Sequence, residues 1–215
     1  MRQIAIDELK KILDEHLKWL QKAEDGECAN LMGVNLVGSN LKGINLSGAN
    51  LEGANLTVAD LTITNFTNAN LEGADLTNAN LEGTFLNRAI LRGANLTKCS
   101  LKYAGLKNAD LAGAIVREAY LMDSDLSGAN LNGANLTRAR ISKTSLAGAN
   151  LEGADLTRIA MFGVNLTGAN LRDANLTAAY LRNCILTDAE FQGANLKGAN
   201  FKNTELPGAR NRLKI

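Results

Sequence analysis

The sequence contains little of what enzymes and most globular cores are built from. Aromatic residues make up 4% of the 215 residues, and the chain has one proline, one histidine and three cysteines. One histidine with scattered cysteines does not supply a catalytic triad or a zinc site, and no glycine-rich loop ending in Lys-Ser or Lys-Thr occurs. We therefore expect no catalytic residues, no metal site and no cofactor, and we predict that the protein is not an enzyme.

The sequence also lacks a charge excess and a long apolar run. Its formal net charge is +1, so there is no overall attraction to nucleic acids or to anionic membranes. No stretch of 18 apolar residues exists, and Met1-Arg2-Gln3-Ile4 leads into a charged segment rather than an apolar signal core. We therefore expect a cytoplasmic protein with no membrane association and no direct nucleic acid binding.

One five-residue unit, Ala-(Asn/Asp)-Leu-X-X, occupies most of the chain. Residues 49–57 contain two copies, and the unit recurs from Ala29 to Gly208 without an insertion or a deletion. Every fifth residue from Leu31 to Leu206 is therefore a core candidate, which makes 36 positions, of which 30 are leucine. The other six are also large and apolar, namely Phe66, Val116, Ile141, Met161, Phe191 and Phe201.

A period of five fits neither a helix nor a strand, and it indicates a solenoid whose units bury their apolar residues by stacking. The residue two positions before each central residue is small, so a unit has two inward and three outward side chains. The last position is mostly Gly or Asn, as in Gly53 and Asn68, and both tolerate the positive φ of a type II turn. The chain is predicted to turn a corner in every unit, with outward Asn and Asp side chains bonded to the adjacent backbone.

This uninterrupted register resembles the pentapeptide-repeat proteins over about five-sixths of the chain. The resemblance implies an all-β solenoid, specifically a right-handed quadrilateral β-helix with four units per coil and about nine coils. Three segments are predicted. Residues 1–28 form an N-terminal amphipathic helix that caps the first coil, residues 29–208 form the β-helix, and residues 209–215 form a C-terminal tail.

The three cysteines are interpreted as structural filler rather than as redox or metal groups. Cys99 and Cys184 fall in the small inward position about four coils apart, which is far beyond the ~7 Å Cα separation that a disulfide spans. Cys28 is the last residue of the N-terminal segment 1–28, here called the leader, and it directly precedes the first unit.

Residues 7–23 are predicted to form one amphipathic helix, because apolar residues recur at spacings of three and four. Asp7 and Glu8 suit its start, and Gly26 suits its exit. A solenoid leaves the apolar side of its first coil open, so we interpret the helix as a cap and His16 as a packed cap residue. The alternative is that Trp19 and the flanking lysines form a docking or dimerisation surface. The apolar stripe comprises Leu9, Ile12, Leu13, His16, Leu17 and Leu20.

The C-terminal end contains no strong cap in the sequence. Phe201 and Leu206 in the last coil would be exposed unless Leu213 and Ile215 fold over them, or unless a second chain covers them. The second arrangement would produce an end-to-end homodimer.

Outward residues 20 positions apart stack above one another, which divides the surface into four faces. The face through Leu31 has a net charge of −4, and the face through Leu36 has a threonine ladder and a net charge of +2. The face through Leu41 and Leu61, here called the third face, has a net charge of +3 and all three tyrosines. We predict that it binds a partner through Tyr103, Tyr120, Met122, Arg140, Phe162, Tyr180 and Arg182.

Outward aromatic residues interleaved with arginine are typical of interface hot spots. Together with Ile63, the apolar members of the third face are predicted to form one contiguous patch. The alternative is that these side chains pack along the ladder and only stabilise it.

The sequence leaves three candidate functions. We predict a non-enzymatic structural scaffold that presents a rigid surface to an unidentified protein partner. The family resemblance implies an alternative, a DNA-mimic modulator of DNA gyrase that protects against quinolones. Members of that type are generally acidic dimers whose coils are often interrupted by loops, and this near-neutral, unbroken repeat departs from them. The third function is homo-assembly through the apolar face or through an open end.

Overall fold

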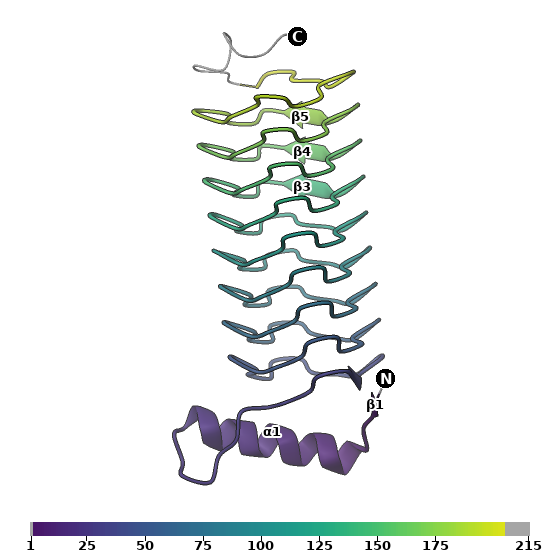
Figure 1. The fold of residues 1–215 in the computed structure, drawn as a ribbon, viewed down its shortest axis with the longest axis vertical. Helices are drawn as coiled ribbons and strands as arrows, with labels where there is room; N and C mark the ends of the chain where they lie inside the picture. The colour runs from purple at the N-terminus through teal and green to yellow at the C-terminus, as the bar shows by residue number, and fades with distance from the viewer. Residues whose placement is uncertain (1, 205–215) are drawn as a thin grey trace.

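A computed structural model of the protein describes residues 2–204. Figure 1 shows a stack of coils with a single helix lying across the N-terminal end. The elements in chain order are β1 (Arg2–Gln3), α1 (Ile6–Leu20), β2 (Val34–Asn35), β3 (Arg140–Ser142), β4 (Ala160–Phe162) and β5 (Tyr180–Arg182).

Each coil of the stack takes four five-residue units. Parallel bridges join residues 20 positions apart, from Asn30 with Asn50 to Tyr180 with Asn200. Backbone hydrogen bonds hold neighbouring coils together: the Leu31 N–H donates to the Asn50 carbonyl at 2.7 Å, and the Asn50 N–H donates to the Ala29 carbonyl at 2.9 Å. The predicted quadrilateral β-helix is therefore confirmed, although its last predicted unit, at Leu206, lies outside the described residues.

The core is a stack of leucine and alanine ladders. Every central residue from Leu31 to Phe191 is buried, and Leu196 and Phe201 are partly buried. Cys99 and Cys184 are buried in the small inward position as free thiols, in line with their interpretation as filler. The predicted division into two inward and three outward side chains thus describes the interior of the β-helix.

The corner of every unit is a tight turn with a positive φ. The Val34 N–H donates to the Leu31 carbonyl at 3.1 Å, and Gly33, the third residue of that turn, has a φ of 62°. The same position has a positive φ in every unit from Gly33 to Asn203. Outward Asn and Asp oxygens accept hydrogen bonds from the backbone N–H two residues later; for example, the Thr57 N–H donates to the Asn55 Oδ1 at 2.9 Å. Both turn predictions are confirmed.

The helix α1 (Ile6–Leu20) is shorter than the predicted 7–23, and its exit differs from the prediction. Lys22, with a φ of 59°, takes the left-handed conformation after the helix. Gly26 is needed for another reason, because a Cβ there would collide with the backbone nitrogen of Trp19. The placement of Leu17 on the apolar stripe is wrong, since its side chain is 53% exposed at the flank of the helix.

The remaining apolar side of α1 covers the first coil. Leu9 and His16 are buried, and Ile12 packs against the core. The short strand β1 pairs in parallel with β2, with Arg2 opposite Val34, so the chain before the helix also adds to the first coil. No pattern in the sequence indicates this pairing, because a strand of two residues has no periodicity to detect.

The predictions for the C-terminal end remain predictions. The tail at residues 209–215 lies outside the described residues, as do Leu206, Leu213 and Ile215. The end-to-end homodimer depends on these residues.

Candidate functional site

The three longest strands lie next to one another on the third face. In β3, β4 and β5, Arg140 is in register with Ala160 and Tyr180, and Ser142 is in register with Phe162 and Arg182. Because the central residue of each strand points inward, the residues on either side of it form two parallel columns on the surface. The fold thereby brings together side chains 20 and 40 positions apart in the sequence.

These columns enclose a groove that is almost entirely apolar, here called the apolar groove. Its volume is about 400 Å³. Ala160 has only a methyl group where its neighbours in the column have a guanidinium group and a phenol, so the surface is hollowed at this point. The groove is lined by Met122, Arg140, Ile141, Ser142, Ala160, Met161, Phe162, Tyr180 and Arg182.

A second, polar hollow adjoins the groove at the corner between the second and third faces, and it is called here the corner hollow. Its volume is about 460 Å³. The Arg140 guanidinium carbon lies 5.5 Å from the centre of the Tyr120 ring, which is within the range of a cation–π contact. Arg140 lines both hollows. The corner hollow is lined by Asn78, Lys98, Glu118, Tyr120, Arg138 and Arg140.

The structure brings together six of the seven predicted partner-binding residues. Five of them line the apolar groove, and Tyr120 lies next to it in the corner hollow. Tyr103 lines neither hollow, although its side chain is 66% exposed in the turn of the preceding coil. The five in the groove are Met122, Arg140, Phe162, Tyr180 and Arg182.

The prediction of one contiguous apolar patch that includes Ile63 is wrong. Ile63 lies near the N-terminal end of the stack, where it packs between Gly43 and Gly83. Three coils separate it from Met122, so it forms a contact of its own along the turn column.

Sequence reasoning missed the residues that give the groove its shape. Ala160 and Ser142 are small, and a search for prominent side chains passes over them. Arg138 and Lys98 belong to the neighbouring face and reach this site only because the chain turns a corner between positions 138 and 140. Comparing residue sizes along each column at intervals of 20 would have identified the gap at Ala160.

A third hollow lies where the end of α1 meets the β-helix. Trp19 stacks on His16 with ring centres 5.4 Å apart, and its ring approaches Gly48. Lys18 pairs with Glu15 and Asp25. This is where the alternative docking surface was predicted. The hollow has a volume of about 530 Å³ and is lined by Trp19, Leu20, Lys22, Ala23, Ser47, Gly48 and Asn68.

Residues 2–204 contain neither a metal-binding cluster nor a membrane-spanning helix. No group of three or more His, Cys, Asp or Glu side chains is placed there to hold a metal ion. The one helix in that range is too short and too polar to cross a membrane.

The chain matches a known protein family over most of its length. The family described as "Pentapeptide repeats" matches in eight copies, and no curated protein sequence matches significantly. The family matches cover residues 29–68, 59–93, 86–117, 104–142, 119–158 and 165–203.

Solved structures of pentapeptide repeat proteins are similar to the chain. HetL from the cyanobacterium Nostoc sp. strain PCC 7120, described as involved in regulation of heterocyst differentiation, is 28% identical, with 95% of this chain and 98% of HetL covered and a TM-score of 0.46. A trypsin-treated variant of QnrB1, a plasmid-mediated fluoroquinolone resistance protein, is 22% identical, with coverages of 86% and 96% and a TM-score of 0.59. The protein alr5209, also from Nostoc, is 39% identical over 41% of this chain and 69% of its own, with a TM-score of 0.28.

Proposed function

Because the chain belongs to the pentapeptide repeat family, we propose that it is a non-enzymatic scaffold that binds a protein partner through the apolar groove of the third face. The observation that carries this proposal is the groove itself. A nearly apolar hollow bordered by aromatic and arginine side chains is the arrangement in which interface hot spots are found.

The exposure of the aromatic residues favours binding over simple ladder packing. The Tyr180 side chain is 59% exposed and the Phe162 side chain is 47% exposed. Side chains that served only to pack along a ladder would cover one another. Here Ala160 stands between Arg140 and Tyr180, and Ser142 stands between Met122 and Phe162, so each column is interrupted by a small residue.

Affinity capture from host lysate tests this proposal with two double variants. The Phe162→Glu, Tyr180→Glu variant places two charges in the groove, and we expect it to lose a partner that the wild type captures. The matched control is Phe85→Glu, Ile185→Glu, which adds the same charge at two exposed apolar positions on the adjacent face. The control should keep the partner.

Circular dichroism must show that both variants remain folded. The proposal is wrong if the wild type captures no protein that the groove variant loses, or if both variants lose the same protein. Light scattering during size exclusion shows whether the captured partner is a second copy of this chain.

The likeness to QnrB1 does not lead us to propose a gyrase modulator. At 22% identity that likeness shows the shared fold alone. The third face has a net charge of +3 and the whole chain has +1, whereas a duplex mimic needs dense negative charge. A supercoiling assay with purified gyrase tests this point, and we expect neither inhibition nor protection from a quinolone.

A further inference from the structure

The charges around the apolar groove are distributed differently from those on the rest of the β-helix. On other parts of the β-helix most cations lie beside carboxylates, as in Lys102 with Glu82 at 3.3 Å and Arg172 with Glu190 at 2.9 Å, and those without an ion pair within residues 2–204, such as Arg88 and Lys197, are scattered singly. Around β3, β4 and β5, five exposed cations form no ion pair within residues 2–204. They are Arg138, Arg140, Lys143, Arg158 and Arg182.

No carboxylate stands among these cations. The outward positions of the third face in the coils that contain β3, β4 and β5, together with the corner positions just before them, hold five basic residues and no Asp or Glu. The acids nearest to them are Asp155, which precedes Arg158 by three residues and accepts hydrogen bonds from Thr137 and Thr157, and Asp123, which lies one coil before Lys143. In the preceding coil Glu118 is already paired with Lys98 and Arg117. The field at the mouth of the groove is therefore positive, and a negative partner would reduce the repulsion between these cations.

The apolar and cationic parts of the site meet at Arg140. This residue forms one wall of the groove on the side of Ala160, and it also lines the corner hollow together with Arg138 and Lys98. A ligand that fills both hollows must combine an apolar group with an anionic group a few ångströms away. A short peptide segment with an aliphatic or aromatic side chain and a neighbouring carboxylate meets both requirements.

We propose that the partner segment bound by the groove is an acidic, amphipathic peptide. One apolar side chain enters the groove over Ala160, and a carboxylate a few residues away pairs with Arg138 and Arg140. This inference rests on the proposed function and specifies the chemistry of the partner.

Single-stranded nucleic acid is the competing occupant. It would use the same cations for its phosphates and the aromatic side chains for stacking. The groove favours a peptide because its lining is almost entirely apolar and offers few groups that pair with the polar edge of a base.

A displayed library of random peptides of about twelve residues is the probe. Selection on the wild type should enrich sequences with an apolar residue and an Asp or Glu within about four positions. Two variants separate the two halves of the site. Ala160→Trp fills the groove without a change of charge, and Arg138→Glu, Arg140→Glu reverses the charge at the corner. Each should weaken binding of a selected peptide at least about tenfold.

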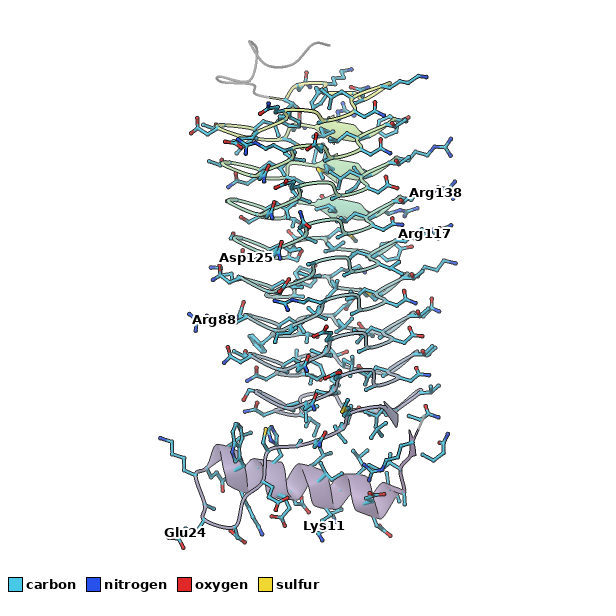
Figure 2. All side chains as sticks on the ribbon, viewed as in Figure 1. Lys11, Glu24, Arg88, Arg117, Asp125 and Arg138 are labelled. Atoms are coloured by element: carbon cyan, nitrogen blue, oxygen red, sulfur yellow. The ribbon has the colours of Figure 1, made fainter. Side chains whose placement is uncertain are left out.

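The matched control for charge reversal is Arg88→Glu, Lys197→Glu. Neither residue forms an ion pair within residues 2–204, and Figure 2 shows Arg88 and Arg138 projecting from opposite sides of the stack. This control should bind the selected peptide as the wild type does. Raising the salt concentration from about 50 mM to about 500 mM should weaken the wild-type complex but not the charge-reversed one, because in that variant salt screens the repulsion between the introduced Glu side chains and the acidic peptide.

The outcomes distinguish this inference from the proposed function. If Ala160→Trp abolishes binding but charge reversal leaves it unchanged, the groove binds peptides and the acidic character is wrong. If no peptide is enriched, or if enriched peptides bind Ala160→Trp normally, the groove does not take a peptide and the inference is overturned. Tighter binding of a labelled oligothymidine than of any selected peptide would assign the site to nucleic acid instead.

Discussion

The Nδ1 atom of His16 accepts a hydrogen bond from the backbone N–H of Ala29 at 3.0 Å, and this bond joins α1 to the first residue of the repeat. A ring nitrogen accepts a hydrogen bond only when it is unprotonated, so the bond requires neutral histidine. Burial acts in the same direction and lowers the pKa of His16 below its ordinary value of 6.5. The cap is therefore held by a group that the folded protein keeps neutral.

We expect the free energy of unfolding to decrease as the pH falls below about 6.5. In that range the unfolded chain gains a proton at His16, while the folded chain takes it up only at lower pH. Above about pH 6.5 both states are neutral and the contribution is constant. His16→Asn provides an acceptor that does not titrate, so its stability should change less between about pH 7 and about pH 5.5, by roughly 1 kcal/mol.

Urea unfolding followed by the fluorescence of Trp19 measures this effect. Trp19 is the single tryptophan of the chain, and it stacks directly on His16. Carboxylates titrate alike in both proteins, so the difference between the two pH profiles isolates His16. Parallel profiles would show that His16 does not couple the cap to pH.

The turn positions give a paired prediction of stability. Val58 has a φ of 59°, which is strained for a β-branched residue, and Gly53 has the same φ with open space where a Cβ would lie. We expect Val58→Gly to stabilise the protein by about 1 kcal/mol and Gly53→Val to destabilise it by about 1–2 kcal/mol. Thermal unfolding monitored by circular dichroism measures both.

Val37→Gly is the control for this pair. Val37 is also exposed, but it precedes the turn glycine and has no positive φ. Its replacement should lower stability slightly, because glycine adds flexibility to the unfolded chain. Stabilisation by Val37→Gly to the same extent as by Val58→Gly would mean that loss of an exposed valine, and not relief of backbone strain, is the cause.

The cysteines should differ in reactivity in the folded protein. Burial raises the pKa of the Cys99 and Cys184 thiols, and it also raises the pKa of the half-buried Cys28 thiol. Only thiolates react rapidly, so at about pH 8 we expect slow labelling of Cys28 and labelling of Cys99 at least about 100-fold slower than that of a free thiol. All three should react in denaturant.

Peptide mapping after labelling with a thiol reagent assigns the reacted positions. Rapid labelling of Cys99 in the absence of denaturant would show that the middle of the β-helix opens. Such opening would contradict a core held by continuous ladders.

The repeat explains why so much of the fold was predictable. Residues equivalent to Leu51 and Gly53 recur in neighbouring units, so the same preferences for an inward side chain and for a positive φ are repeated many times in one register. A wrong structural prediction at one position is therefore outweighed by the equivalent positions of the other units. The leader has no such redundancy, and there the exit of the helix at Lys22, the exposure of Leu17 and the pairing of β1 with β2 were mispredicted or missed.

The candidate site was predictable in part. The sequence placed Tyr180 and Phe162 on one face, because a period of 20 follows from four units per coil. The sequence did not reveal the apolar groove at Ala160, because the depth of a groove depends on the sizes of side chains from three different coils. Nor did it reveal that Arg138 and Arg140, which lie on adjacent faces, line the same hollow.

The sequence by itself determined the solenoid, the inward ladder from Leu31 onward and the left-handed turn of each unit. These features are local, since they depend on residue size and backbone freedom within five positions. The tertiary structure decided which outward residues meet. Stacking of coils sets Ala160 between Arg140 and Tyr180 and gathers five cations that form no ion pair within residues 2–204. These relationships depend on distances between residues 20 or more positions apart.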